Sequence, residues 1–176
     1  MKFTEAPLKD AWIIDLEPKK DERGYFARAF CKNEFDVYEI ESQVVQVNVS
    51  FNHKAGTLRG MHYQKAPVEE TKIVRCTRGS LYDVIIDMRP DSPTYMQHFG
   101  IELSEENMRK LFVPRGFAHG YLTLEDNTEA SYMVSEFYTP EVEGGVRYND
   151  PAFGIKWPFP IACLSDKDAN WPLIEA

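Results

Sequence analysis

The chain of 176 residues carries 43% hydrophobic and 27% charged residues, which is typical of a globular protein, and its length favours one domain spanning residues 1–176. The formal net charge of -8 argues against general binding to nucleic acids or to anionic membranes, because both need a basic surface. The cysteines Cys31, Cys76 and Cys163 form no CxxC pair, and no apolar run approaches the roughly 20 residues of a membrane span, so we expect a protein of the reducing cytoplasm.

Short segments that alternate apolar and polar residues dominate the chain, and this period of two predicts strands. The expected strands are residues 43–50, 71–77, 81–88, 98–103, 110–113, 120–124 and 130–137. Residues 78–80, with a central glycine, predict a hairpin turn between the second and third of these strands. Residues 32–38 predict a short helix, and residues 104–107 a capped helical turn. Many short strands at close spacing indicate a sandwich or barrel, around which the proline-rich C-terminal segment is expected to wrap as irregular chain.

The segment at residues 58–64, L-R-G-M-H-Y-Q, sets a histidine beside an arginine on a predicted strand. Arg59 stays charged at neutral pH, whereas His62 can gain or lose a proton there. A base close to a fixed cation suits removal of a proton from carbon and stabilisation of the resulting anion. A lone histidine in a β-rich core is more often a structural hydrogen-bonding group, so both interpretations stay open on this segment alone.

Lys72 lies on the strand predicted next, and alternation alone does not determine whether it shares a face with Arg59 and His62. If the three converge, their cavity would need an anion, because uncompensated buried cations are unfavourable. A carboxylate on the far ring nitrogen of His62 would fix its tautomer and raise its basicity. The candidate carboxylates are Asp83, Asp87 and Asp168.

Two tyrosines offer further chemistry. Tyr132 and Tyr138 are evenly spaced, which predicts that both lie on one face of the strand at 130–137 and its continuation. Aromatic core packing is one interpretation of this pair. The functional interpretation makes Tyr132 a proton donor and Tyr138 a stacking platform for a ring.

Metal and cofactor motifs are incomplete or missing. Residues 114–119, P-R-G-F-A-H, match the second half of the metal motif of cupin barrels, but the first half needs two histidines one residue apart. Tyr63 and Gln64 follow His62 instead, so a site with three ligands is hard to assemble, and we expect no bound metal. The chain has no Walker loop, no dinucleotide-binding glycine motif and no Gly-x-Ser-x-Gly elbow, so we expect no other cofactor and no serine-hydrolase chemistry.

A series of motifs, taken in order, resembles the dTDP-4-dehydrorhamnose 3,5-epimerase family nearly from end to end. The motifs are D-E-R-G-Y-F at 21–26, Q-V-N-V-S at 46–50, L-R-G-M-H-Y-Q at 58–64, S-P-T at 92–94, P-R-G-F-A-H-G at 114–120, N-D-P at 149–151 and S-D-K-D at 165–168. The resemblance implies an all-β, cupin-type jelly-roll barrel with short peripheral helices. It also implies a homodimer, a site without metal, and a nucleotide-linked 4-keto-6-deoxyhexose as substrate.

The same resemblance implies roles for individual residues. His62 would remove a proton next to the C4 ketone, with Asp168 as its partner, and Lys72, aided by Arg59, would stabilise the enolate. Tyr132 would return a proton from the opposite face at C3, C5 or both. The positions that match binding residues of the family are Arg23, Gln46, Asn48, Arg59, His119, Tyr138, Glu143 and Lys167. Among them, Tyr138 would stack on the base.

One departure from the family leaves the nucleotide open. Arg28 stands where the family usually has a glutamate that contacts the nucleotide end, so a CDP- or GDP-linked sugar is an alternative to the dTDP-linked one. A sugar-nucleotide 3,4-ketoisomerase, a non-catalytic sugar-nucleotide-binding cupin and, more distantly, a metal-dependent oxygenase also stay open. The family points to surface polysaccharides, such as O-antigen, as the destination of the sugar.

Overall fold

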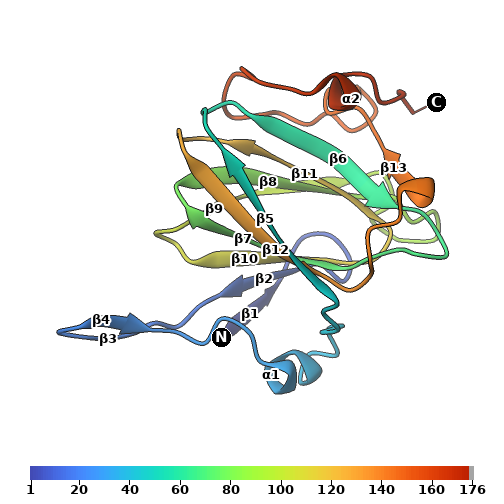
Figure 1. Ribbon diagram of the computed structural model, residues 1–176. Coiled ribbons are helices and arrows are strands. Elements are labelled where there is room, and N and C mark those ends of the chain that lie inside the picture. The colour runs from blue at the N-terminus through green and yellow to red at the C-terminus, as the bar shows by residue number, and fades with distance from the viewer. Residues whose placement is uncertain (175–176) are drawn as a thin grey trace.

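Two antiparallel β-sheets face each other in the computed structural model, which describes residues 1–174 (Figure 1). The six-stranded sheet has the order β1 (Lys2–Glu5), β2 (Trp12–Asp15), β10 (Arg109–Val113), β7 (Lys72–Arg78), β12 (Thr128–Val134) and β5 (Gln46–Asn52). The five-stranded sheet has the order β13 (Glu143–Gly145), β6 (Leu58–Gln64), β11 (Phe117–Thr123), β8 (Ser80–Asp87) and β9 (His98–Ser104). From β5 to β8 and from β9 to β12 the chain changes sheet at each step, which is the connectivity of a jelly roll, so the predicted all-β fold is confirmed.

Short peripheral elements complete the fold. They are the arm β3 (Lys19–Asp21) and β4 (Gly24–Phe26), the helices α1 (Lys32–Asp36) and α2 (Asp166–Ala169), and the 3-10 helix η1 (Pro140–Val142). The arm extends away from the two sheets, and α1 lies close to its base (Figure 1). The predicted domain runs to residue 176, and its last two residues lie outside the described residues. No helix within residues 1–174 is long and apolar enough to cross a membrane.

Apolar side chains from both sheets fill the space between them. Val74, Leu111 and Ala130 of the six-stranded sheet pack in one cluster with Leu81 and Ile85 of the five-stranded sheet, and all five are fully buried. Burying a leucine or isoleucine side chain stabilises a fold by roughly 1.5–3 kcal/mol, so this cluster holds the sheets together.

A second apolar cluster covers the outer face of the six-stranded sheet. Phe35 of α1 is fully buried there against Ile14, Ile73 and Phe112. Because Ile73 and Val74 are consecutive on β7, they point to opposite faces, and β7 is buried on both sides. The predicted helix at 32–38 is confirmed, although it ends at Asp36.

Three local predictions are corrected. Residues 78–80 do not form a hairpin, because β7 pairs with β10 and β12 whereas β8 pairs with β9 and β11. Gly79, with a φ of +70°, turns the chain from one sheet to the other, which buries both strands. The predicted helical turn at 104–107 is a non-helical turn, closed by Ser104 and Asn107, whose side chains each accept a hydrogen bond from the backbone of the other. The strand predicted at 130–137 ends at Val134, so Tyr138 lies beyond it.

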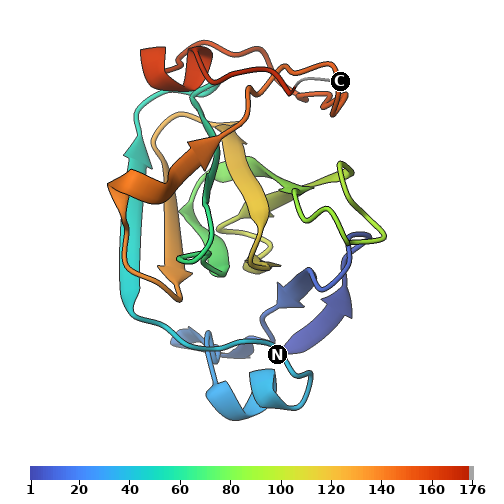
Figure 2. The same cartoon turned by 90° about the vertical axis from the view of Figure 1, so that its right-hand side faces the viewer.

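The C-terminal segment crosses the edge of the sheets next to β6 (Figure 2). Thr57 and Cys163 form an isolated parallel bridge, and the backbone N–H of Leu58 donates to the carbonyl of Cys163 at 2.9 Å. The N–H of Cys163 in turn donates to the carbonyl of Gly56 at 3.1 Å. These bonds tie the residues before α2 to the start of β6, and they bring α2 beside that strand.

Two glycines let β6 and β11 approach closely at the centre of the five-stranded sheet. A Cβ atom on Gly60 would lie 2.5 Å from the Cα of Gly120, and one on Gly120 would lie 2.7 Å from the carbonyl oxygen of Arg59. Gly60 also has a φ of +131°, a conformation open to glycine and strained for other residues. The close approach sets the register in which His62 and His119 face each other across the two strands.

We expect Gly60→Ala to lower the free energy of unfolding by about 1–3 kcal/mol more than Gly24→Ala does, because only the first change forces backbone atoms together. Gly24 is a matched control, since its φ of +126° imposes similar backbone strain while a Cβ there meets nothing within 4 Å. Urea unfolding of the two variants measures the difference. Equal losses would show that backbone strain, and not close packing of β6 on β11, makes Gly60 necessary.

Candidate active site

The inner face of the six-stranded sheet carries two rows of polar side chains near one end. Val134 of β12 pairs with Gln46 of β5 and with Lys72 of β7, so these three point to the same side. In the next row on that face, Tyr132 pairs with Asn48. Alternation therefore turns Lys72 and Tyr132 inward together, which the sequence alone did not determine.

These rows form one wall of a cavity of about 360 Å³, and His62 of the opposing five-stranded sheet lies on another wall. The complete lining is Gln46, Asn48, His62, Tyr63, Gln64, Glu70, Lys72, Tyr132, Val134, Tyr138 and Glu143. Seven of the residues predicted from the sequence therefore meet in this cavity: Gln46, Asn48, His62, Lys72, Tyr132, Tyr138 and Glu143. A histidine and a tyrosine approach the same space from different sheets.

Asp168 stands behind His62. Its Oδ1 lies 2.5 Å from Nε2 of His62, although the two residues are 106 positions apart in the chain. Its Oδ2 accepts from the N–H of Gly60 at 3.3 Å, and the Nε1–H of Trp171 donates to Oδ1 at 3.4 Å. Ser165 caps α2 by accepting from the N–H of Asp168 at 3.1 Å, which fixes the backbone that carries the carboxylate. The contact leaves Nδ1 as the ring nitrogen of His62 that is available for chemistry.

The charge of Asp168 is stabilised despite its burial. Burial by itself would raise the pKa of this carboxyl group, but the hydrogen bond and charge of His62, with the donors from Gly60 and Trp171, lower its pKa below the ordinary value. Asp168 is therefore ionised at neutral pH. An ionised partner stabilises the imidazolium that forms when His62 takes up a proton.

Lys72 and Tyr132 line the same cavity, and Lys72 is nearly buried. Nζ of Lys72 lies 3.1 Å from Oε1 of Glu70, and the two side chains are only 11% and 12% exposed. Burial raises the pKa of the Tyr132 phenol, and the nearby Tyr121 and Glu70 raise it further, while Arg59 opposes them. Tyr132 is accordingly protonated at neutral pH and can donate a proton.

Tyr138, Glu143 and Lys167 form a linked group at the rim. The hydroxyl of Tyr138 donates to Oε2 of Glu143 at 3.1 Å, and Nζ of Lys167 donates to Oε1 of Glu143 at 2.6 Å. The prediction that Tyr138 shares a strand with Tyr132 is wrong, since β12 ends four residues before it, yet both residues line the cavity. The Tyr138 ring is 56% exposed and can offer a face to a ligand at the entrance.

Arg59 and His119 lie outside the cavity lining. Nε of Arg59 donates to Oδ1 of Asn52 at 2.8 Å, and Nε2 of His119 lies 2.7 Å from Oδ1 of Asp83. Asp83 is therefore the partner of His119 and not of His62. The third candidate carboxylate, Asp87, is bound by Arg89, so Asp168 is the one that pairs with His62.

The structure does not bring Arg23 and Arg28 to the cavity. Arg23 lies between the strands of the β3–β4 arm, where it pairs with Asp21, and its side chain is 83% exposed. Arg28 follows the arm and pairs with Glu34 at 2.9 Å, and Glu34 also holds the N-terminal ammonium at 2.7 Å. The guanidinium of Arg28 is thus held by Glu34 at the base of the arm.

A family model described as dTDP-4-dehydrorhamnose 3,5-epimerase matches residues 5–176. The chain belongs to this family. A dTDP-4-dehydrorhamnose 3,5-epimerase of Sinorhizobium fredii is 44% identical over 173 residues, which cover 98% of this chain and 89% of the relative. The predicted family, and with it the class of isomerases, is confirmed.

Solved structures of the epimerase family superpose closely on the fold. The Bacillus anthracis epimerase with TDP and PPi bound is 41% identical, with a TM-score of 0.95 over 98% of this chain and 99% of that one. The Legionella pneumophila enzyme in complex with dTDP-4-keto-L-rhamnose is 34% identical, with a TM-score of 0.91 over 98% and 92% of the two chains. The chain thus resembles these epimerases in the arrangement of its strands as well as in its sequence.

Glu70 and Trp171 are among the residues at the site that were not predicted from the sequence of this epimerase. Glu70 precedes Lys72 by two positions, and continued alternation before β7 could have placed it on the same side. Trp171 lies three positions after Asp168, and its ring meets His62 edge-on at 6.1 Å between centroids. Its indole fills the space beside Gly145, where a Cβ would clash with the ring. No local pattern around Trp171 indicates this contact.

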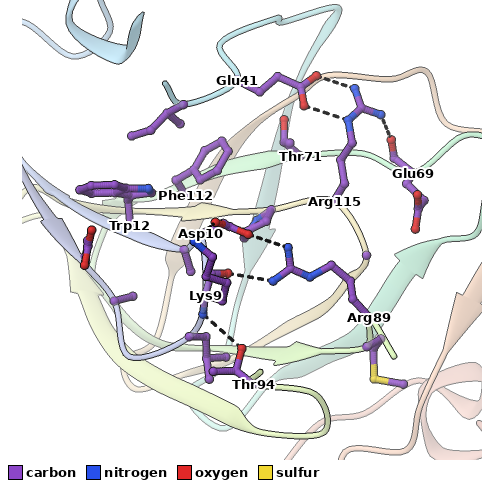
Figure 3. A pocket seen from close by; sticks show the side chains of 18 of the residues that line it. Lys9, Asp10, Trp12, Glu41, Glu69, Thr71, Arg89, Thr94, Phe112 and Arg115 are labelled. Carbon is purple, nitrogen blue, oxygen red and sulfur yellow. Dashed lines mark hydrogen bonds and ion pairs between the residues drawn. The ribbon is translucent and has the colours of Figure 1, made fainter. Parts of the chain in front are cut away.

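A larger hollow, of about 1280 Å³, lies between the N-terminal residues, the segment after α1 and the turns at 88–94 and 112–116. Its two arginines are already paired, as Figure 3 shows: Arg89 with Asp10 at 2.9 Å, and Arg115 with Glu41 at 2.8 Å. It holds neither the histidine nor the lysine of the smaller cavity. We therefore assign the chemistry to the smaller cavity.

Within residues 1–174, no group of three or more His, Cys, Asp or Glu side chains is placed to hold a metal ion.

The contact between His62 and Asp168 makes stability depend on pH. Because the native-state pKa of Asp168 is lowered, its contribution to stability is present above the ordinary pKa of 3.8 and is lost as the pH falls through the lowered value. We expect Asp168→Asn to lower the free energy of unfolding by about 1–3 kcal/mol at pH 7 and by less in acid below pH 3.8. Urea unfolding of the wild-type protein and the variant at pH 7 and below pH 3.8 tests this. An equal difference in the free energy of unfolding at both pH values would contradict it.

Proposed function

We propose that the protein epimerises a dTDP-linked 4-keto-6-deoxyhexose at C3, C5 or both. The observation that carries the proposal is the placement of His62 and Tyr132 on opposing sheets around one cavity, with Lys72 on the same wall as Tyr132. Epimerisation requires removal of a proton from one face of a carbon and return of a proton to the other. A single base tends to restore the original configuration, whereas two groups on different walls can invert it.

His62 is the base in this proposal. The ketone at C4 acidifies the hydrogens on C3 and C5, and Nδ1 of His62 takes up the proton while Nε2 stays bonded to Asp168. The ionised Asp168 keeps the ring in one orientation and stabilises the imidazolium. General base catalysis of this kind contributes typically about 10²- to 10⁴-fold in rate.

Lys72 and Tyr132 complete the reaction. As the proton leaves carbon, negative charge gathers on the C4 oxygen, and the Lys72 ammonium is the cation in the cavity that can stabilise it. The protonated phenol of Tyr132 then delivers a proton to carbon from the other wall. The reaction needs no electron transfer, and each step moves only protons and the electron pair of the enolate.

The nucleotide end is proposed to lie at the rim. Tyr138 offers an exposed ring for stacking on the base, while Gln46 and Asn48 offer amide groups inside the cavity. The Bacillus anthracis relative binds TDP and the Legionella pneumophila relative a dTDP-sugar, which supports thymine as the base here. The pairing of Arg28 with Glu34 makes the reversed charge at that position compatible with the same nucleotide.

We further propose a homodimer in which the arm of one protomer reaches the cavity of the other. Phe26 at the end of β4 is 71% exposed, and Val47 and Val49 on the outer face of the edge strand β5 are 57% and 64% exposed. Exposed apolar side chains such as these are typical of an interface, and an edge strand invites pairing. Because β5 also carries Gln46 and Asn48, an arm laid across it would bring Arg23 to the rim of the site.

The cytoplasmic location expected from the sequence stays a prediction, which cell fractionation would check.

Proton NMR in deuterated water with dTDP-4-keto-6-deoxyglucose tests the function. We expect deuterium to enter at C3, C5 or both, with a product of inverted configuration. No exchange with dTDP-, CDP- or GDP-linked 4-keto-6-deoxysugars would contradict the proposal, and a product with its carbonyl moved from C4 would identify a ketoisomerase instead.

Two variants assign the roles in the same experiment. His62→Ala should lower exchange by at least about 10²-fold with the fold retained, while His98→Ala, at the start of the edge strand β9, should leave it unchanged. Tyr132→Phe should keep exchange at one or more centres while net inversion falls, since it removes only the returning proton. Equal loss of exchange and inversion would instead give Tyr132 a role in binding.

The oligomeric state tests the arm. We expect a dimer in light scattering at micromolar concentration, and Val49→Asp should shift it to a monomer because a charge cannot be buried in an apolar interface. Leu173→Asp is the control, since Leu173 is also exposed, at 47%, but lies in the C-terminal segment. A wild-type monomer, or a Val49→Asp dimer, would overturn this interface.

A further inference from the structure

Glu70 is a carboxylate close to the two groups proposed to act on the enolate. It lies in the segment before β7, lines the cavity, and places Oε1 3.1 Å from Nζ of Lys72. With 12% of its side chain exposed, it is shielded from solvent, so its charge is felt strongly by its neighbours. Its charge also repels a nucleotide diphosphate, so a carboxylate here opposes substrate binding unless it serves the chemistry.

The other acidic residue of the lining does not take this role. Glu143 is engaged at the rim by Lys167 and Tyr138, at 2.6 and 3.1 Å. Asp168 is engaged by His62. Among the described residues that line the cavity, Glu70 is therefore the carboxylate that acts on Lys72.

We infer that Glu70 is a positioning residue for the epimerisation: it holds the Lys72 ammonium toward the site of the enolate oxygen. The inference rests on the proposed function. A lysine ammonium has three N–H donors, so Lys72 can stay bonded to Glu70 while it donates to the C4 oxygen of the sugar. A flexible lysine that is anchored in advance needs no reorganisation as charge develops on that oxygen.

The charge of Glu70 also acts on Tyr132, which gives the inference a second readout. The groups that act on its phenol come from several elements: Tyr121 on β11, Arg59 on β6 and Glu70 before β7, with His62 and Lys72 in the same cavity. Burial raises the pKa of the phenol most, and Tyr121 and Glu70 add to this while Arg59 opposes it. Removing the charge of Glu70 should therefore lower the pKa of Tyr132 toward its ordinary value of 10.0.

The test compares Glu70→Gln with the wild-type enzyme in steady-state epimerisation of dTDP-4-keto-6-deoxyglucose across the pH range. Glutamine keeps the size and hydrogen-bonding capacity but not the charge. We expect kcat to fall by up to about 100-fold, as a misplaced catalytic group does, while KM stays unchanged or falls because a charge that repels the diphosphate is gone. The alkaline limb of the kcat profile should move to lower pH. Glu70→Asp, which keeps the charge, should keep the wild-type alkaline limb.

Glu69→Gln is the matched control. Glu69 is the preceding residue, lines the larger hollow and lies outside the smaller cavity, so its change should leave kcat and the pH profile as they are. A Glu70→Gln enzyme with a lower melting temperature but an unchanged kcat and alkaline limb would reduce Glu70 to a structural ion pair and overturn the inference. Wild-type protein that is inactive on every nucleotide sugar would overturn the proposed function, and the inference with it. The two failures are thus distinguishable.

Discussion

Every second side chain of β5, β7 and β12 points toward the opposing sheet, and the candidate site depends on this alternation. It turns Lys72 and Tyr132 inward on one wall, while His62 reaches the same cavity from β6. A shift of one residue in any of these strands would move its polar side chains to the outer face. The apolar cluster between the sheets and the cluster under α1 both resist such a shift, because β7 is buried on its two faces.

Charge is arranged in pairs around this cavity. The chain has a net charge of -8, yet its proposed base and its proposed enolate-stabilising cation each have a carboxylate of their own, Asp168 for His62 and Glu70 for Lys72. Pairing lets ionised groups stay ionised in a poorly solvated space. The two carboxylates come from different places: Asp168 from the C-terminal segment and Glu70 from the residues just before β7. The site is therefore assembled from both sheets and from the chain that wraps them.

Much of the fold could be predicted because alternation is a local signal. The strands at 98–103 and 110–113 were placed within one residue of β9 and β10. The hairpin at 78–80 was wrong because a glycine turn between two apolar strands has the same local pattern whether they pair or separate into two sheets. The position of Tyr138 was wrong because even spacing says nothing about where a strand ends, and β12 ends once its partner β5 has begun at Gln46.

The sequence by itself determined the family, the jelly-roll class and the residue types of the site, because these depend on ordered motifs and on a period of two. The family resemblance implied Asp168 as the partner of His62, but the residue pattern alone left Asp83, Asp87 and Asp168 open, and only the tertiary structure shows the contact that Asp168 makes. It also decided that Lys72 and Tyr132 share a wall, that Glu70 stands against Lys72, and that Arg23 lies on an arm away from the cavity. These are contacts across long separations in the chain or choices of face, and local patterns carry no information about either.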